Sequence, residues 1–371
     1  MKKLISLLIC AILCVPPGAS AAEKPQISAQ SYVLYCPQDK SVVLSREPEK
    51  RMKPASTTKL MTTLLTLEAA QNENKTVEFT AEMEAEGSSM YLKHGEKLKL
   101  SDLAAGMMMC SGNDAANAAA ITIGKTKEGF AGLMNQRAKQ LCMKNTHFVT
   151  PSGLDDDNHY STALDLAKLM AAGLENPAFA RLTAQKSARV SFESPGNKTA
   201  EYNNHNKLLR LDPRCVGGKT GYTVAAGRCL VSAARQNGLT LICVTLNDKN
   251  DWNDHTALYD AGFSSLSAYA PEDLSLKIPC AGGERDEITA VCQSAEPIIL
   301  GGGESGRVRR VIKTEEFVYA PVNKGAKVGS VEYYLDGRLI KKQSLNARDE
   351  VKIQKVKVGL WQKIKEFFNY G

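Results

Sequence analysis

The distribution of apolar residues changes near residue 270, and this change most constrains how the chain can fold. Before it, long helical runs rich in Leu, Met and Ala, such as 58–70, lie among alternating strand-like runs such as 227–245. After it, residues 271–350 hold only short alternating runs separated by glycine-rich turns. Patterns that segregate in this way indicate separate cores. We therefore predict an α+β domain over 22–270 and a small all-β domain, a β-sandwich, over 271–350.

Periodicity also places individual elements. In the first domain we expect two strands within 31–45, helices over 58–70, 103–123, 159–172 and 252–262, and further strands within 227–245. In the second domain, runs at 308–312 and 329–335 read as strands, and Asp336-Gly337 is a strong hairpin signal.

The N-terminus has the three parts of a secretory signal peptide. Two lysines precede a twelve-residue apolar run over 4–15, and Ala19-Ser20-Ala21 supplies the small residues that signal peptidase requires. Twelve residues cannot cross about 30 Å of hydrocarbon as a helix, which argues against a membrane-spanning anchor. We predict that residues 1–21 are cleaved and that the mature chain is exported.

Export leaves eight cysteines, an even number that permits disulfides without fixing any pairing. Cys280 and Cys292 are the pair to test first, because both lie in one short strand-like segment. The sequence has no C-x-x-C or H-E-x-x-H motif, and its five histidines do not show zinc-ligand spacing. We expect neither a metal site nor a cofactor.

Residues 351–371 predict an amphipathic helix lying in a membrane interface. Its large apolar side chains share one arc about 120° wide on a helical wheel. They are Leu360, Trp361, Ile364, Phe367 and Phe368. Lysines flank this arc, as in helices that lie among lipid headgroups. The alternative is a helix docked on its own domain, but the aromatic cluster favours the outer face of the cytoplasmic membrane.

The distribution of charge also favours a membrane surface as partner. The net charge is +7, and five Lys against one Glu lie in 351–371, so the two predicted domains are nearly neutral. Anionic lipid headgroups can use a basic tail of this kind. Aromatic residues make up only 6% of the chain, which is few for stacking nucleic-acid bases. We expect a membrane-surface partner and no nucleic-acid partner.

Three short motifs carry candidate chemistry, and the first is Ser56-Thr57-Thr58-Lys59. At the start of a helix this spacing places the serine hydroxyl and the lysine amine on one face. A neutral lysine there can accept the hydroxyl proton and make Ser56 a nucleophile. Ser56 is the only serine in the chain with a lysine three residues later. The alternative is a capping serine followed by a solvent-exposed lysine.

The other motifs are Ser111-Gly112-Asn113 and Lys219-Thr220-Gly221. The first interrupts a helical stretch with polar groups that are costly among apolar helices, which favours a catalytic loop. The second opens onto a strand, where lysine and threonine can bind a carboxylate and glycine admits a substrate backbone. Each motif alone is also compatible with an ordinary turn. Penicillin-binding proteins and class A β-lactamases share all three in this order.

On these motifs the chain resembles the low-molecular-mass penicillin-binding proteins, the serine-type D-alanyl-D-alanine carboxypeptidases of peptidase family S11. Further similar segments lie at 150–154, 159–163, 320–325 and 333–337. The resemblance implies a β-lactamase/transpeptidase-like catalytic domain, with an antiparallel sheet and an all-helical part, before the β domain. It also implies removal of the terminal D-Ala from peptidoglycan pentapeptides, which limits cross-linking, and covalent inhibition by β-lactams.

The resemblance assigns catalytic roles to Ser56, Lys59 and Ser111. Ser56 would be acylated, Lys59 would be its general base, and Ser111 would relay protons with help from Lys219. Cys110 directly precedes Ser111 and is assigned no catalytic role.

Substrate binding is assigned by the same resemblance to Asn113, Lys219, Thr220, Gly221 and Tyr222. Asn113 would hold the substrate amide, and Lys219 and Thr220 the terminal carboxylate. The backbone N–H groups of the nucleophile and of Tyr222 would form the oxyanion hole. Some members carry His at position 222, so the presence of Tyr removes a titrating side chain there.

Other functions stay open at this point. A class A β-lactamase normally carries a Glu-x-x-x-Asn loop for deacylation, and 150–190 contains no convincing copy. It would also lack the β domain and the terminal helix. A transpeptidase or endopeptidase on the same scaffold is a further alternative. A non-catalytic cell-wall-binding protein is disfavoured because no motif is broken.

Overall fold

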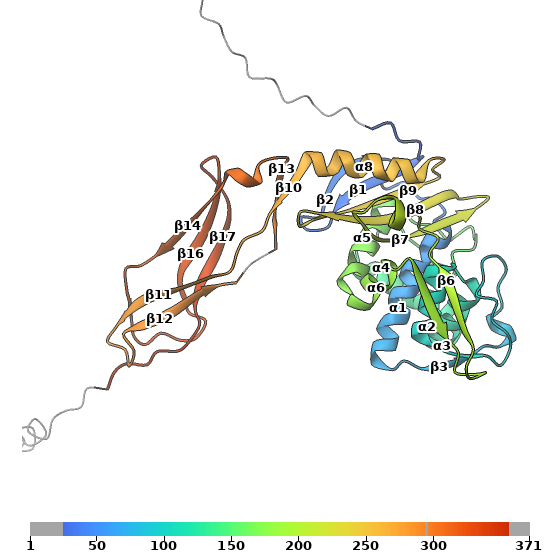
Figure 1. The fold of residues 1–371 in the computed structure, drawn as a ribbon, viewed down its shortest axis with the longest axis horizontal. Helices are drawn as coiled ribbons and strands as arrows, with labels where there is room; N and C mark the ends of the chain where they lie inside the picture. Colours follow the sequence, from blue (N-terminus) through green and yellow to red (C-terminus); the bar gives the residue numbers. More distant parts are fainter. Residues whose placement is uncertain (1–24, 294–295, 356–371) are drawn as a thin grey trace, which may run out of the picture.

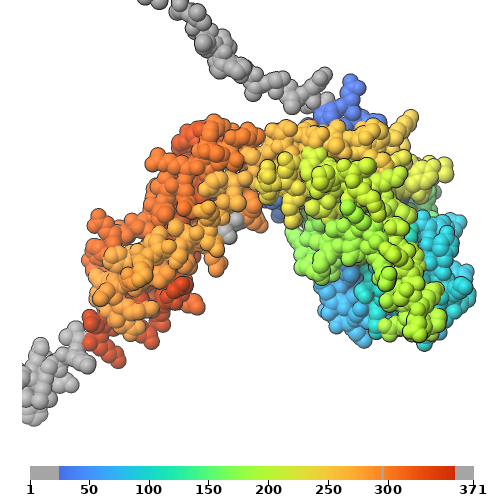
Figure 2. All heavy atoms as spheres, in the orientation of Figure 1, coloured from blue at the N-terminus to red at the C-terminus, as the bar shows by residue number. Residues whose placement is uncertain are grey.

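The computed structural model describes residues 25–293 and 296–355, which fold into two lobes (Figures 1 and 2). The strands of the larger lobe are β1 (Ser31–Cys36), β2 (Ser41–Arg46), β3 (Thr76–Glu78), β4 (Lys97–Lys99), β5 (Ser187–Ser191), β6 (Thr199–Asn203), β7 (Cys215–Thr223), β8 (Gly227–Gln236) and β9 (Leu239–Leu246). Its helices are η1 (Ala55–Thr58), α1 (Lys59–Asn72), η2 (Ala81–Met83), α2 (Leu100–Met109), α3 (Asn113–Gly124), α4 (Lys127–Gln140), α5 (Ala163–Glu175), α6 (Pro177–Thr183), α7 (Leu208–Leu211) and α8 (Asp251–Ser265). The smaller lobe contains β10 (Leu266–Tyr269), β11 (Leu274–Ala281), β12 (Glu287–Cys292), β13 (Ile298–Gly301), η3 (Ser305–Arg307), β14 (Val308–Thr314), β15 (Val318–Tyr319), β16 (Lys327–Leu335) and β17 (Arg338–Ala347).

A five-stranded antiparallel sheet, in the order β2-β1-β9-β8-β7, forms the centre of the larger lobe. Strand β9 is buried along its whole length, so its alternate side chains face two different cores. Ile242 and Val244 pack with the helical core, whereas Leu241 and Cys243 pack with Leu258 of α8. The sheet therefore lies between α8 and the remaining helices, as Figure 1 shows. Strand β7 stands at one edge of this sheet.

The helical stretch expected over 103–123 is broken at the second motif. Helix α2 ends at Met109, α3 begins at Asn113, and Ser111 between them has φ +61°. A non-glycine residue in the left-handed region cannot continue a right-handed helix. The chain therefore turns at Ser111, between the end of α2 and the start of α3.

Most of the elements expected from periodicity are confirmed. The strands at 31–45 and 227–245 are β1, β2, β8 and β9, and the helices at 58–70 and 252–262 are α1 and α8. The helix expected from residue 159 begins later, at Ala163, because Thr162 is its N-cap and accepts the backbone N–H of Asp165. Residues 160 and 161 are instead extended and form β-bridges with 147 and 52.

The smaller lobe is all β, as expected. A six-stranded sheet, in the order β14-β16-β17-β12-β11-β15, is accompanied by the two-stranded β10-β13 ribbon. Its core centres on Val331, Tyr333 and Leu345. Asp336 and Gly337 link β16 to β17 with φ +48° and +84°, the left-handed pair that a tight hairpin turn requires. The α+β fold class with a second, all-β domain is confirmed.

Cys280 and Cys292, the pair to test first, do not form a disulfide. All eight cysteines in the described part of the chain are free thiols. Cys292 stands opposite Leu274 at one end of the β11–β12 pair, whereas Cys280 lies next to β15 at the other end. Six residues of extended chain separate these positions by about 20 Å, far beyond disulfide reach.

The two predicted targeting segments fall almost entirely outside the described residues. Of the predicted terminal helix, only 351–355 are described, and they are extended: Val351 bridges Val322, and Ile353 bridges Gly283. The helix therefore does not begin at residue 351, because this stretch completes the β domain. In residues 25–293 and 296–355, no helix is both long and apolar enough to cross a bilayer.

Candidate active site

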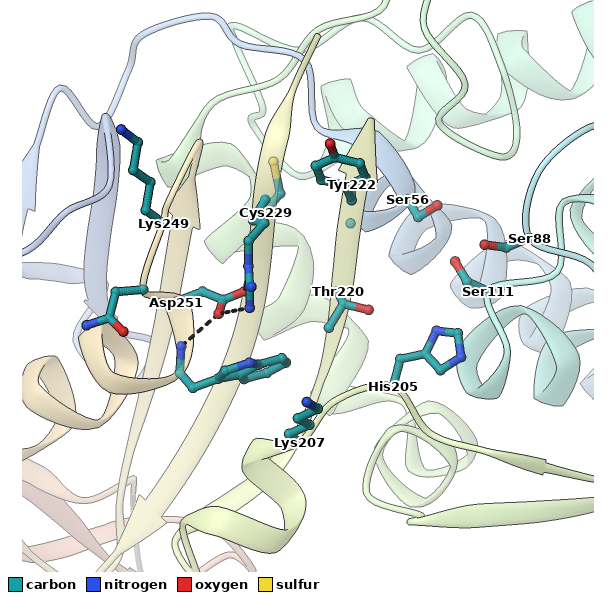
Figure 3. Close-up of a pocket in the computed structure, with 14 residues that line it drawn as sticks. Ser56, Ser88, Ser111, His205, Lys207, Thr220, Tyr222, Cys229, Lys249 and Asp251 are labelled. Atoms are coloured by element: carbon teal, nitrogen blue, oxygen red, sulfur yellow. Dashed lines mark hydrogen bonds and ion pairs between the residues drawn. The ribbon is translucent and has the colours of Figure 1, made fainter. Parts of the chain in front are cut away.

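The fold brings the three motifs together from three separate parts of the larger lobe. Ser56 lies in the 3₁₀ turn η1 at the start of α1, Ser111 lies in the α2–α3 break, and Lys219 lies on the edge strand β7. Figure 3 shows Ser56 and Ser111 facing each other at one end of a cleft, with Thr220 and Tyr222 on the strand beside them. All eight residues expected in the site therefore meet at one place.

The amine of Lys59 is the most enclosed group in the site, with no solvent-exposed surface. Its Nζ lies 2.9 Å from Ser56 Oγ, 2.6 Å from Asn113 Oδ1 and 2.7 Å from the Ser152 carbonyl oxygen. A neutral amine has two hydrogens and one lone pair. The two carbonyl oxygens can only accept, so they take both hydrogens. The lone pair is then left for the hydroxyl proton of Ser56.

Burial makes the neutral form of this lysine accessible. Desolvation lowers the pKa of Lys59 well below its ordinary value, and the nearby charge of Lys219 lowers it further. Burial also lowers the pKa of Lys219, to about 8. Because two positive charges so close repel each other, protonation of Lys59 and Lys219 at the same time is disfavoured. Lys59 therefore has the properties of a general base toward Ser56.

Ser111 is tied to the second lysine. The Lys219 Nζ lies 3.1 Å from Ser111 Oγ and 2.9 Å from the backbone oxygen of Thr220. Lys219 donates a hydrogen bond to a lone pair of the Ser111 oxygen. The hydroxyl hydrogen of Ser111 therefore points away from Lys219. That hydroxyl can pass a proton to a leaving group in the cleft.

Both polar atoms of the Asn113 side-chain amide form hydrogen bonds within the protein. Its Oδ1 accepts from Lys59, and its Nδ2 donates to the Glu86 carbonyl at 2.6 Å. The structure thus gives Asn113 a part in orienting the general base. The contact with substrate that the resemblance implies stays a prediction.

The backbone beside each reactive hydroxyl is strained. Ala55, directly before Ser56, has φ +49°, and Ser111 itself has φ +61°. Left-handed conformations of this kind cost about 1–3 kcal/mol each in non-glycine residues and persist only where surrounding contacts enforce them. The sequence gives no sign of this strain, because neither alanine nor serine is typical of the left-handed region.

Gly221 lies where β7 passes very close to the nucleophile segment. A Cβ atom at Gly221 would lie 3.0 Å from the backbone N of Ser56 and of Thr57, and 3.1 Å from the Pro54 oxygen. The N–H groups beside Ser56 and those of the strand therefore border the same small space. The side chain of Tyr222 is 66% exposed and leaves this space free.

The cleft extends well beyond the motif residues and has a volume of about 770 Å³. Several lining residues were not anticipated: Ser88, His205, Lys207, Arg228, Lys249 and Trp252. Figure 3 shows Lys249 and Asp251 at the end away from Ser56. The carboxylate of Asp251 forms an ion pair with Arg228. These residues lie in segments without any recognisable motif, so no pattern in the sequence could have identified them.

Cys110 has the properties of an inert thiol. Burial raises its pKa to about 11, and its Sγ–H donates to the Gly106 carbonyl at 3.3 Å. Within residues 25–293 and 296–355, no group of three His, Cys, Asp or Glu side chains lies close enough to hold a metal ion.

Comparison with known proteins identifies the family. Residues 18–250 match the family model described as D-alanyl-D-alanine carboxypeptidase, and residues 245–353 match the C-terminal domain of penicillin-binding protein 5. The chain belongs to the D-alanyl-D-alanine carboxypeptidase family. The match covers more than half of the chain and decides against the β-lactamase alternative.

The carboxypeptidase has relatives that match nearly its whole length and others that match about two thirds of it. It is 28% identical to D-alanyl-D-alanine carboxypeptidase DacF of Bacillus subtilis, over 98% of this chain and 100% of that protein. It is 31% identical to DacB2 of Mycobacterium tuberculosis over 66% of this chain and 86% of that one. Penicillin-binding protein 5 of Haemophilus influenzae has a similar structure, with a TM-score of 0.68, 27% identity and coverage of 88% and 98%. The serine carboxypeptidase function and the hydrolase class are thereby confirmed.

The tight fit at Gly221 gives a first prediction. Gly221→Ala should slow acylation of the carboxypeptidase by a fluorescent penicillin by up to about 10-fold, because the new Cβ must displace β7 slightly from Ser56. Gly132→Ala in α4 is the matched control, since its Cβ would meet no atom within 4 Å. The control should label at the wild-type rate. Equal labelling rates for both variants would contradict the proposed close approach.

Proposed function

We propose that Ser56 carries the D-alanyl-D-alanine carboxypeptidase reaction, with Lys59 as its general base. The supporting observation is the Lys59 amine, whose two hydrogens are bound by carbonyl oxygens while its lone pair meets the Ser56 hydroxyl. As Ser56 Oγ attacks the carbonyl carbon of the penultimate D-Ala of a peptidoglycan stem peptide, its proton passes to Lys59 Nζ. The carbonyl π electrons move to oxygen and form a tetrahedral oxyanion.

The backbone N–H groups of Ser56 and Tyr222 are proposed to stabilise that oxyanion. Removing one such donor typically costs about 3–4 kcal/mol of transition-state stabilisation. Lys219 and Thr220 hold the terminal carboxylate of the substrate, and the positive charge of Lys219 suits that anion. The narrow space at Gly221 supports this placement, because it sets β7 against the nucleophile.

Ser111 is proposed to complete acyl transfer. Its hydroxyl gives a proton to the amine nitrogen of the departing D-Ala as the C–N bond breaks, and the proton taken up by Lys59 restores it. The products are free D-Ala and an ester on Ser56 Oγ. Water then attacks the ester carbonyl, releases the shortened peptide and returns the proton to Ser56. A β-lactam also forms an ester on Ser56 Oγ when its ring amide opens, but the nitrogen stays attached to the acyl group, so the β-lactam acts as a covalent inhibitor.

Labelling and product release test the assignment together. Ser56→Ala should abolish covalent labelling by a fluorescent penicillin and lower D-Ala release from a D-Ala-D-Ala pentapeptide by at least about 10³-fold, since the acyl-enzyme cannot form. A circular dichroism spectrum like that of the wild type would establish that the variant is folded. Labelling that survives Ser56→Ala would place the nucleophile elsewhere. Cross-linked peptide in place of free D-Ala would indicate a transpeptidase.

We also propose that the chain is exported through residues 1–21 and held at the outer face of the cytoplasmic membrane by its C-terminal segment. The basic, aromatic-rich sequence of that segment supports this location. The last described residues lie at the end of the smaller lobe away from the catalytic lobe (Figure 1). Apolar side chains are exposed near this point: Ile353 by 60%, Tyr319 by 73% and Phe317 by 44%. An exposed apolar group of this kind is suited to a lipid interface.

Truncation tests the membrane attachment. A chain ending at Lys355 keeps the Val351 and Ile353 bridges of the β domain and removes the amphipathic segment. It should no longer sediment with vesicles that contain phosphatidylglycerol, while penicillin acylation stays at the full-length rate. The full-length mature chain should sediment, and less so at high salt. Vesicle binding by the truncated chain equal to that of the full-length chain would place the attachment elsewhere.

A further inference from the structure

His159 lies beneath the active site and belongs to none of the three motifs. Its imidazole is 2% exposed and is bonded on both sides. Nδ1 accepts the backbone N–H groups of Val149 at 3.0 Å and Thr150 at 3.1 Å, and Nε2 lies 2.8 Å from Thr58 Oγ1. Two donors at Nδ1 require a lone pair there, so the ring proton is on Nε2 and is donated to Thr58.

The loop that His159 holds supplies one of the three partners of Lys59. Within 149–154, the Ser152 carbonyl accepts from Lys59 Nζ at 2.7 Å, and the Pro151 carbonyl accepts from Thr62 Oγ1 at 2.6 Å. Gly153 is so close to the nucleophile segment that a Cβ there would lie 2.0 Å from the Ala55 oxygen. The loop therefore cannot shift without moving the acceptor of Lys59 or the segment before Ser56.

We infer that His159 is a positioning residue for acylation, which clamps the 149–154 loop to Thr58 and so holds the Ser152 carbonyl where it orients the Lys59 amine. Thr58 stands between Ser56 and Lys59 on the same turn, so the clamp joins the loop directly to the nucleophile segment. If the Ser152 oxygen moves, one Lys59 hydrogen loses its acceptor and the lone pair is no longer fixed toward Ser56. The inference rests on the proposed roles of Ser56 and Lys59.

The clamp requires a neutral imidazole. Protonation would place an N–H at Nδ1 against the two backbone N–H groups that now donate to it. Burial disfavours this by lowering the pKa of His159 to about 4, although the charge of Asp156 acts in the opposite direction. The ring of Phe148 packs edge-on at 5.7 Å and closes the apolar side of the pocket. The geometry is therefore maintained at neutral pH.

Substitution of His159 tests this role through separate acylation constants. Varying the concentration of a fluorescent penicillin gives a non-covalent dissociation constant and a first-order acylation constant. His159→Ala should lower the acylation constant about 10- to 100-fold, as misplacement of a catalytic group does, with the dissociation constant unchanged. His159→Asn should restore part of the rate, because its Oδ1 can accept from the two loop amides.

His255 provides the matched control, because it is also a fully buried histidine bonded at both nitrogens. Its partners are Ser232 Oγ at 2.7 Å and Thr245 Oγ1 at 3.1 Å, on the face of the sheet covered by α8. His255→Ala should lower the unfolding midpoint and leave the acylation constant of the folded protein unchanged. If both alanine variants lower acylation equally, or if His159→Ala acylates at the wild-type rate, the inference is overturned.

Thr58→Val tests the same clamp if His159→Ala does not fold. It removes the hydroxyl partner with little change in shape, and it should lower the acylation constant. Thr58→Val combined with His159→Asn should acylate no more slowly than the slower single variant, because both changes remove the same contact, the hydrogen bond between residue 159 and Thr58 Oγ1. Fully additive losses would contradict the clamp. Normal acylation by the His159 and Thr58 variants, with labelling still lost in Ser56→Ala, would overturn only the inference and not the proposed function.

Discussion

A lysine amine buried without solvent contact is the constraint on which the active site depends. An isolated ammonium in such a place carries a large desolvation penalty, and proteins relieve it by releasing the proton. The protein supplies two carbonyl acceptors for the Lys59 amine and places Lys219 nearby, so the charge is disfavoured and the hydrogens are satisfied. The same conditions leave one lone pair directed to Ser56. The same surroundings of the Lys59 amine thus bury it, satisfy its hydrogens and activate Ser56.

The rest of the larger lobe fixes the partners of this amine. A left-handed Ser111 breaks the helical stretch and brings Asn113 to the start of α3, where its Oδ1 meets Lys59. The 149–154 loop brings the Ser152 carbonyl from another side. The edge strand β7 closes the site with a glycine against the η1 backbone. Because these parts are far apart in sequence, they are held in place by tertiary contacts: the packing of the two cores around the sheet and hydrogen bonds such as that between His159 and Thr58.

Local patterns were sufficient for most of the expected helices and strands and for the motif residues, but not for the start of α5 or for the extended chain at 351–355. The spacing of Ser56 and Lys59 reports a helix face, and the order of the three motifs is specific enough to indicate the family. Contacts made by backbone atoms could not be predicted in this way. The Ser152 carbonyl has no sequence signature, because every residue has a backbone carbonyl. The left-handed Ala55 is likewise invisible, since long-range contacts impose it. Cys280 and Cys292 were the pair to test first and are both free, because closeness in sequence does not determine strand register.

Titration of the Lys59 amine decides whether this group is the base that activates Ser56. In protein labelled with ¹³C at lysine Cε, the Lys59 resonance can be assigned by its absence in Lys59→Met and followed between pH 6 and 11. If Lys59 is the base, its pKa lies well below the usual 10.4, and the acylation rate rises as pH increases through that pKa. A Lys59 that stays protonated up to about pH 10, while acylation is already fast at pH 7, would contradict the account.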